Sequence, residues 1–197
     1  MNLPLSGALL IFVVAIVASL VGLYGAPKFL ERNLFRPYWL LRRKQYATVV
    51  TSGFLHADLM HLIFNMMTFY FFAFPLERRI GTLRFVVLYF AGLLISHAGT
   101  YFKQRNNPDY ASVGASGAIA AVLFAAIVYF PNQSLFIIPI PVPIPAPLFA
   151  LGYLAYTYYA ARHAQGRINH DAHLGGAVTG LAFVAVTDPS AYARIFS

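Results

Sequence analysis

Four polar side chains stand near the starts of apolar segments, and two of them make a nucleophile and base pair. His61 and Asn65 lie near the start of one segment, Ser116 near the start of a second, and His173 near the start of a third. A serine hydroxyl becomes a good nucleophile when a neighbouring imidazole accepts its proton. His61 and Asn65 are four residues apart, which places both side chains on one helix face. The residue types therefore indicate acyl transfer by a Ser116–His173 dyad.

Glycines surround the serine and follow the histidine. Ser116 lies within Gly114-Ala115-Ser116-Gly117, where glycine permits a tight turn into a helix and lets a substrate carbonyl approach the backbone. The unpaired N–H groups and the dipole at a helix N-terminus favour a developing oxyanion. Gly176 and Gly180 give the His173 segment a face of small residues, and the serine segment has a matching face at Ala118, Ala121 and Ala125. We therefore expect the two helices to approach closely enough for the imidazole to reach the hydroxyl.

Other intramembrane protease chemistries lack their residues. An aspartyl protease needs two membrane-buried aspartates, but every aspartate lies at or beyond the end of an apolar segment: Asp58, Asp109, Asp171 and Asp188. Neither glutamate stands in a His-Glu-x-x-His motif, and the chain has no cysteine, which excludes thiolate catalysis. The stretch 170–173, His-Asp-Ala-His, has no third ligand nearby in sequence. We therefore predict no metal site and no small-molecule cofactor.

The composition indicates a protein of the lipid bilayer. Of 197 residues, 59% are hydrophobic and only 10% are charged, with a mean hydropathy of +0.66. The net charge is +8, but the basic residues lie between apolar runs and no motif that reads RNA or DNA accompanies them. We therefore expect anionic lipid headgroups, and not nucleic acid, as the partner of these charges.

Six apolar stretches are long enough, or nearly so, to cross a hydrocarbon core, which requires about 20 helical residues. They cover residues 5–24, 59–74, 83–102, 113–130, 146–161 and 172–187. The first is too long for a signal-peptide core and no basic residue precedes it, so we expect a retained span. An open sheet would leave backbone groups unpaired in lipid. The sequence thus predicts an all-α membrane protein, a bundle of six transmembrane helices in a single domain covering residues 1–197.

The polar residues occur in the second, fourth and sixth of these stretches. Alternate helices enter the bilayer from the same face, so these three starts share one side and a similar depth. Polar groups are expensive in hydrocarbon, and a cluster of them at matching depth is expected to be functional.

Two connections between the stretches are unusual. Residues 26–58 are basic and aromatic, a composition typical of an interfacial element that rests on lipid headgroups. Residues 139–147 alternate proline with other residues, and proline lacks the N–H donor that a helix needs. We therefore expect a long interfacial first loop and, later, a stiff extended strap.

Three motifs together resemble the defining motifs of the rhomboid intramembrane serine proteases. They are Gly114-Ala115-Ser116-Gly117, His61-Leu62-Ile63-Phe64-Asn65, and Ala172-His173-Leu174-Gly175-Gly176 with Gly180. The resemblance runs from about Thr51 to Thr187, and it includes the six-span order, Phe54-Leu55-His56-Ala57, and Glu77 with Gly81.

This resemblance implies a mechanism and a class of substrate. It implies that Ser116 attacks the scissile peptide bond and that His173 is the general base and acid. It also implies an oxyanion hole made by His61, Asn65 and the backbone N–H groups of Ala115 and Ser116. The implied substrates are single-span membrane proteins whose helix unwinds near small or helix-breaking residues.

Two positions depart from the family pattern. Many members carry a Trp-Arg pair where this chain has Ala47-Thr48, and an aromatic often follows the nucleophile by four residues, where this chain has Ala120. The resemblance therefore predicts no stacking partner for His173 from that position. We assign structural roles to the remaining histidines: His56 as a hydrogen-bonding residue that fixes a loop, His97 as a satisfied polar residue, and His163 as a residue at headgroup level.

Two alternatives to a protease stay open. One is a noncatalytic relative that binds transmembrane helices without cutting them. The other is a small transporter, which would more often show an internal repeat or paired broken helices, and neither is visible in the sequence.

The orientation in the membrane receives opposing indications. The positive-inside rule, applied to the loops, indicates an outside N-terminus. The resemblance implies an inside N-terminus with an outward active site, and we prefer it because the charges of the long first loop are poor topology determinants if that loop lies sideways in the membrane. We expect a multi-pass protein of the bacterial cytoplasmic membrane.

Overall fold

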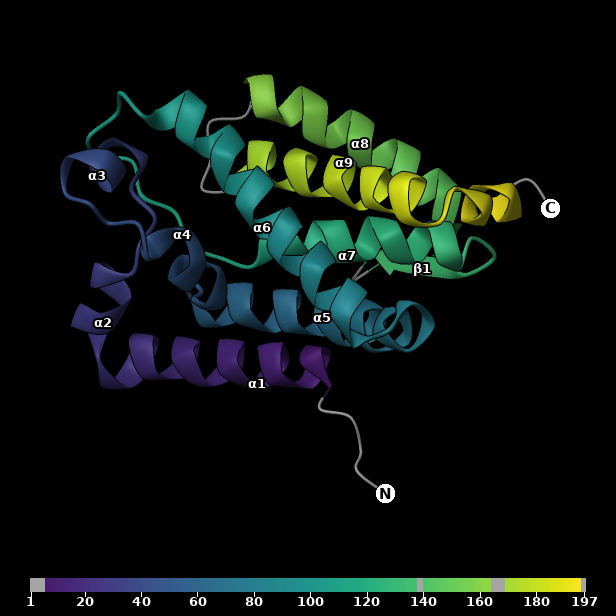
Figure 1. Cartoon of the computed structure of the whole chain (residues 1–197), viewed down its shortest axis with the longest axis horizontal. Helices are drawn as coiled ribbons and strands as arrows, with labels where there is room; N and C mark the ends of the chain where they lie inside the picture. Colours follow the sequence, from purple (N-terminus) through teal and green to yellow (C-terminus); the bar gives the residue numbers. More distant parts are fainter. Residues whose placement is uncertain (1–5, 138–139, 164–168, 196–197) are drawn as a thin grey trace.

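A computed structural model of the chain describes residues 6–137, 140–163 and 169–195. Helices dominate, and the longer ones lie side by side along the long axis, with α6 oblique to the others (Figure 1). In chain order the helices are α1 (Gly7–Leu20), the π-helical η1 (Val21–Gly25), α2 (Pro27–Arg32), α3 (Pro37–Arg42), α4 (Thr48–Thr51), the 3-10 helix η2 (Ser52–Phe54), α5 (Leu59–Ile80), α6 (Thr82–Gln104), α7 (Ser116–Tyr129), α8 (Ala146–His163), α9 (His170–Thr187) and the 3-10 helix η3 (Pro189–Ile195). Each predicted apolar stretch therefore contains a helix, although Leu5 at the start of the first lies outside the described residues.

Helix α7 is the centre of the molecule. Every residue from Gly117 to Tyr129 is buried, and α5, α6, α8 and α9 all contact this helix. Its 14 residues rise about 21 Å at 1.5 Å per residue, which is less than the roughly 30 Å of a hydrocarbon core. Ser116 is the first residue of this short central helix.

Three helical stretches are long and apolar enough to cross a membrane: Gly7–Gly25, Leu59–Ile80 and Thr82–Gln104. Helix α9 followed by η3, bent by 113°, would be a fourth if the pair is one span. By this measure the structure supports fewer crossings than the six predicted, because α7 is short and the aromatic-rich α8 is less apolar than the stretches that pass. The outer faces still carry the exposed apolar surface of a bilayer protein, at Leu9, Val13, Val17, Phe71, Val87, Leu94, Leu151 and Val178 among others.

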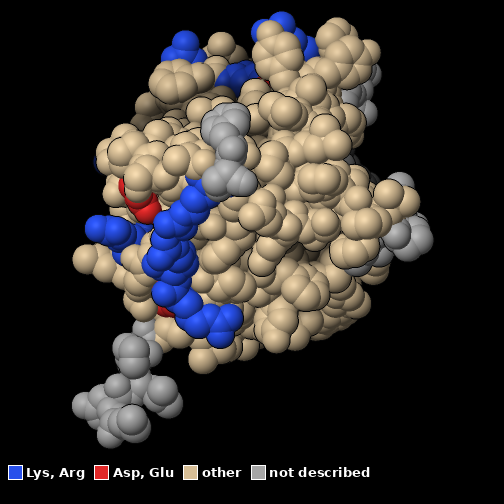
Figure 2. Space-filling model, turned by 90° about the vertical axis from the view of Figure 1, so that its right-hand side faces the viewer, with Lys and Arg blue, Asp and Glu red and all other residues tan. Residues whose placement is uncertain are grey.

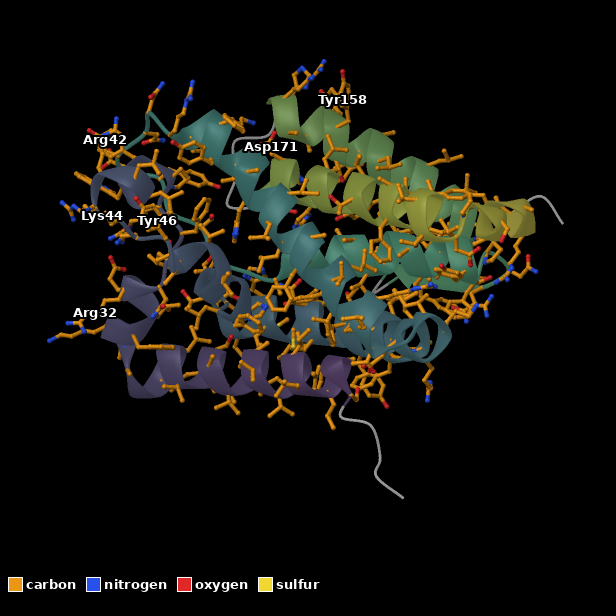
Figure 3. All side chains as sticks on the ribbon, viewed as in Figure 1. Arg32, Arg42, Lys44, Tyr46, Tyr158 and Asp171 are labelled. Atoms are coloured by element: carbon orange, nitrogen blue, oxygen red, sulfur yellow. The ribbon has the colours of Figure 1, made fainter. Side chains whose placement is uncertain are left out.

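Charged side chains gather at the two ends of this apolar body. At one end Arg32, Arg42, Lys44 and Tyr46 project outward from the region of α2 to α4 (Figure 3). Figure 2 shows the opposite end, where basic side chains form a narrow band on a surface that is otherwise largely uncharged. The sequence supplies that end with arginines in the last turn of α5 (Arg78 and Arg79) and near the start of α6 (Arg84). An apolar body between two polar ends fits a chain that sits across a bilayer.

Residues 26–58 form a series of short helices rather than an open loop. Trp39 of α3 donates its indole N–H to the Pro108 carbonyl oxygen at 3.2 Å, and the Arg43 guanidinium lies 3.8 Å from the centre of the Trp39 ring. Phe35 and Ser112 exchange two backbone hydrogen bonds, of 2.9 and 3.0 Å. These contacts tie the first connection to the segment that leads into Ser116.

A two-stranded hairpin interrupts the helices, so the all-α prediction is wrong for this segment. Strand β1 (Ser134–Ile137) pairs antiparallel with β2 (Ile140–Pro145), with Leu135 opposite Ile144. The extended geometry predicted for 139–147 is confirmed for 140–145 and is wrong for Ala146 and Pro147, which begin α8; Pro139 lies outside the described residues. Alternate prolines lack donors, and a strand built from them is tolerated because only one of its edges has to pair.

The N-terminal helix is joined to the bundle by a buried carboxylate. Glu77 of α5 is only 7% exposed and accepts hydrogen bonds from Ser6 Oγ at 2.5 Å and from the Gly7 backbone N–H at 2.7 Å. These groups belong to the first turn of α1, whose N–H groups have no acceptor within the helix. The negative charge at this positive helix end stabilises the packing of α1 against α5.

Candidate functional site

The turn that presents Ser116 depends on glycine. Gly114 has a φ of +123°, a conformation that side chains other than glycine rarely adopt. A Cβ added there would lie 2.9 Å from His61 Cε1, so the imidazole rests directly against this glycine. The Gly114 N–H donates to the Ser52 carbonyl oxygen at 3.0 Å, which fixes the turn to the first connection. Ala115 is then the N-cap of α7 and Ser116 its first residue.

The backbones of α7 and α9 touch through the predicted small residues. A Cβ on Gly176 would overlap the Gly117 carbonyl oxygen, and a Cβ on Gly180 would overlap the Ala121 carbonyl oxygen. The predicted close approach of the two helices is thereby confirmed. Gly117 follows Ser116 directly, and His173 stands three residues before Gly176. The glycine contact therefore places Ser116 and His173 at the same level of the helix pair.

Helix α6 contacts α7 and α9 near Ser116 and His173. Ser96 donates to the Ala172 carbonyl oxygen at 2.9 Å, and a Cβ on Gly117 would overlap the Ser96 hydroxyl. Asn169, the N-cap of α9, accepts from the Ala172 N–H at 3.1 Å and donates to Thr100 of α6 at 2.8 Å. The start of α9, and with it His173, is thus held by hydrogen bonds to α6.

Ser116 and His173 face one cavity of about 750 Å³. Asn65 lines the same cavity, and most of the remaining wall is apolar, with Phe64, Phe71, Phe72, Leu123, Leu135, Phe136 and Phe149. The walls come from α5, α7, α8, α9 and the hairpin. The structure therefore brings three of the four predicted polar side chains, from the starts of α5, α7 and α9, to one hollow.

Asn65, which lines this cavity, also carries an unused hydrogen-bond donor. Its Nδ2 atom is buried and makes no hydrogen bond within the described part of the chain. A buried amide donor without a partner costs about 1–3 kcal/mol. Proteins commonly keep such an unpaired donor where a ligand or a reacting group supplies the missing hydrogen-bond partner.

His61 is not among the described residues that line the cavity. Its backbone N–H is capped by Asp58 Oδ1 at 2.8 Å, and its ring meets the His56 ring edge to face, with centroids 5.0 Å apart. The ring packs against Gly114. His61 therefore supports the turn before Ser116 more directly than it faces the hollow.

His56, whose ring contacts His61, is buried and neutral. Its Nδ1 lies 2.9 Å from the Ser19 hydroxyl of α1, which confirms the predicted hydrogen-bonding role. Burial lowers the pKa of His56 to about 3, since little water is left to solvate the cation; the nearby His61 ring lowers it further and Asp58 opposes the shift. His97, also predicted to be a satisfied polar residue, has its Nδ1 2.8 Å from the Val49 carbonyl oxygen.

Tyr153 is a site residue that the sequence reasoning missed. Its hydroxyl oxygen lies 3.2 Å from His173 Nδ1, and the two rings are stacked with a 21° angle between their planes. It comes from α8, and it belongs to no motif around the serine or the histidines. The only sequence signal is the aromatic character of α8, which does not tell which ring faces inward.

Ser116 and His173 line the same cavity, and no hydrogen bond joins them in the described structure. Catalytic hydrogen bonds in ligand-free enzymes are often long and tighten only when substrate binds. A second, polar cavity of about 20 Å³ is lined by Ser116 together with Ser96, His97, Ser112 and Asn169, among others. A space of this size accommodates one water molecule.

Comparison with known proteins agrees with this geometry. The rhomboid domain profile matches residues 43–189. RHOMBOID-like protein 12, mitochondrial, of Arabidopsis thaliana is 31% identical over 152 residues, which cover 66% of this chain and 43% of that protein. Presenilin-associated rhomboid-like protein A, mitochondrial, of Danio rerio is 33% identical over 138 residues, 69% of this chain and 36% of that protein. YdcA of Bacillus subtilis (strain 168), provisionally named a rhomboid protease, is 37% identical over 91 residues, 45% of each chain.

The chain spans less than half the length of these three relatives. The profile nevertheless covers most of this chain, including the glycine-flanked serine, the α5 polar pair and the start of α9. The match and the packing of α7 against α9 lead to one conclusion: this chain is an integral membrane protein of the rhomboid family.

Proposed function

We propose that this protein is an intramembrane serine endopeptidase with Ser116 as nucleophile and His173 as general base and acid. The observation that carries the proposal is that a glycine-flanked serine and an imidazole line one cavity together with an asparagine whose buried amide donor is unpaired among the described residues. A structural role alone would not require an unsatisfied buried donor in the same hollow as a nucleophile and a base.

The proposed reaction proceeds by acyl transfer. His173 accepts the Ser116 proton while the serine oxygen attacks the scissile carbonyl carbon, and the imidazolium then protonates the leaving amine. The Asn65 amide and the backbone N–H groups of Ala115 and Ser116, at the start of α7, stabilise the oxyanion. His61 contributes to this hole through its position against Gly114. Water then hydrolyses the acyl-enzyme, and the small polar cavity beside Ser116 offers it a place.

The proposed substrates are membrane proteins with a transmembrane helix. Most residues that line the cavity are apolar, phenylalanine and leucine among them, which suits an apolar segment that has unwound locally. In this proposal all six long helices cross the bilayer as one domain, with α2 to α4 resting on anionic headgroups through their basic and aromatic side chains. The proposed location is the bacterial cytoplasmic membrane; cell fractionation tests it, and the named relatives include both bacterial and mitochondrial proteins.

A serine-directed fluorophosphonate tests the function. The purified protein in detergent should be labelled, and labelling should disappear in Ser116→Ala and fall steeply in His173→Ala, with cleavage of a reporter transmembrane protein lost in parallel. Ser134→Ala is the matched control, because Ser134 lines the same cavity but takes no part in the proposed chemistry.

A noncatalytic helix-binding protein is the second candidate. It is favoured by the absence of a Ser116–His173 hydrogen bond among the described residues. Folded wild-type protein that is neither labelled nor able to cut the reporter, yet retains the reporter helix in co-purification, would replace the protease proposal with this one.

A further inference from the structure

Helix α8 contributes a polar group to the base. The Tyr153 hydroxyl oxygen lies 3.2 Å from His173 Nδ1, with the ring centroids 6.4 Å apart. Tyr153 also lines the large cavity together with Ser116 and His173. The contact joins two helices, and it leaves the other imidazole nitrogen, Nε2, free of this partner.

The base requires one protonation pattern to act on the serine. An imidazole that accepts the Ser116 proton at Nε2 carries its own hydrogen on Nδ1. That Nδ1–H needs an acceptor, and the phenol oxygen of Tyr153 is within hydrogen-bond distance. A partner on Nδ1 holds both the tautomer and the direction of the ring, as an orienting group does in serine hydrolases generally.

The carboxylate nearest to His173 in the sequence forms an ion pair with another residue. Asp171 stands two residues before His173, but its Oδ2 pairs with Lys103 Nζ at 2.6 Å. Lys103 also donates to the Ala161 carbonyl oxygen at 2.8 Å, which keeps this pair at the loop side of α9. Asp171 is therefore occupied as an anchor between α6 and α9, and Tyr153 is the polar group in contact with Nδ1.

The tyrosine ring is itself held by neighbouring rings. Phe149, one turn earlier on α8, stacks on it at 5.7 Å between centroids, and Phe124 of α7 meets it at 5.4 Å. Ala120 of α7, which lines the same cavity, offers no ring to His173 from the serine helix. The ring that stacks on His173 therefore comes from α8.

We propose that Tyr153 is the positioning residue of His173, accepting the Nδ1–H and stacking on the imidazole in place of an aromatic at position 120. This inference rests on the proposed protease function. It makes the base depend on a side chain from a different helix, so the seating of α8 controls whether His173 is aligned with Ser116.

Steady-state cleavage of a reporter transmembrane protein in liposomes tests the inference. Tyr153→Phe removes only the hydroxyl, and Tyr159→Phe is the matched control, since Tyr159 lies on the same helix with 63% of its surface exposed. We expect Tyr153→Phe to lower kcat about 10-fold with little change in KM, the size of effect that one hydrogen bond supports.

The pH profile separates positioning from simple packing. An acceptor on Nδ1 stabilises the protonated ring, so the rising limb of kcat/KM against pH should move to lower pH in Tyr153→Phe and stay in place in Tyr159→Phe. Tyr153→Leu, which lacks both ring and hydroxyl, is the second variant should the phenylalanine variant not fold, and it should lose at least as much kcat. Thermal unfolding in detergent verifies that each variant is folded.

Each outcome is decisive. An inactive, unlabelled wild type overturns the protease proposal and this inference with it. An active wild type whose Tyr153→Phe and Tyr153→Leu variants match Tyr159→Phe in kcat and in pH profile overturns this inference alone. An unchanged pH profile with a raised KM makes Tyr153 a wall of the cavity and equally overturns the positioning role.

Discussion

Asn65 is unfavourable for folding, and in the proposed mechanism it is useful for chemistry. Its buried Nδ2 has no acceptor in the described structure, although it sits in the same cavity as the serine. In a tetrahedral intermediate the oxyanion would be that acceptor. A donor that is in place before substrate arrives is what makes electrostatic stabilisation effective.

Asn65→Ala should lower kcat roughly 100- to 1,000-fold, the usual loss for one oxyanion donor. Thermal stability should stay the same or rise slightly, because the variant removes an unsatisfied buried amide. Cleavage kinetics and unfolding in the same detergent give both numbers. Thr68→Ala, in the same helix and cavity, is the control; equal kcat in the two variants would remove Asn65 from the oxyanion hole.

At this scale the sequence reveals residues that lie in motifs and misses those that do not. Ser116, His173 and Asn65 were found because rare polar groups at the starts of apolar segments are informative. Tyr153 is one of several tyrosines in α8, and no periodicity distinguishes the ring that reaches His173 from those that face outward. Only the packing of α8 on α9 selects it.

The contact between α7 and α9 is the element-scale feature on which the site depends. The contact leaves no room for a side chain at position 176, because the Gly117 carbonyl oxygen occupies the space where a Cβ on Gly176 would lie. Any side chain there must push the helices apart. Separation of the helices would also separate the serine from the histidine.

Gly176→Ala should therefore destabilise the fold by about 1–3 kcal/mol, as overpacking does, and abolish fluorophosphonate labelling. Gly152→Ala in α8 is the matched control, because a Cβ there meets nothing within 4 Å, and its higher helix propensity should leave stability unchanged or slightly raised. Melting temperatures in detergent compare the two. Equal melting of both variants would contradict the close contact.

The connection between α1 and the start of α5 should be sensitive to acid. The folded pKa of His56 is about 3 and that of a free histidine is about 6.5, so the unfolded state binds the extra proton. Stability from this residue is complete above about pH 6.5 and is lost progressively as the pH falls toward 3. His56→Asn should melt with a weaker dependence on pH between 7.5 and 4.5 than the wild type. The exposed His163→Asn should keep the wild-type slope, and the same slope in both variants would rule out His56 as the acid-sensitive group.

Element boundaries were predictable where composition changes sharply and unpredictable where tertiary contacts decide. Ala146 starts α8 where proline alternation ends, as predicted. Helix α5, in contrast, runs six residues beyond its predicted end, to Ile80, through Pro75. The pairing of β1 with β2 was missed because every second residue of β2 is a proline, which hides the usual strand pattern.

On the scale of the whole molecule, the charges and the apolar belt determine how the protein sits in a membrane. The N-terminal ends of α5, α7 and α9 point toward the end that carries α3 and α4 (Figure 1). That end is also the more basic one, so charge alone would turn it inward, opposite to the outward active site that we propose. The sequence cannot decide between these, because loop charges count differently when the segment lies along the membrane.

The natural absence of cysteine makes the orientation directly measurable. Lys44→Cys reports on the end near the site, and Arg84→Cys reports on the opposite end. In intact bacterial cells, a membrane-impermeant maleimide should label Lys44→Cys at once and Arg84→Cys only after lysis. The reverse pattern would establish the charge-based orientation, and labelling of both from outside would contradict a bundle that crosses the bilayer.

The carbon-rich wall of the large cavity has a practical consequence for inhibitor chemistry. The cavity beside Ser116 has an apolar wall that includes Phe64, Phe136 and Phe149, so a compound must be desolvated before it can react with the hydroxyl. Uncharged warheads on alkyl or aryl tails should inactivate the protein faster than sulfonated or peptidic ones of equal intrinsic reactivity. The same preference makes detergent tails competitors for the site, so apparent potency should fall as micelle concentration rises.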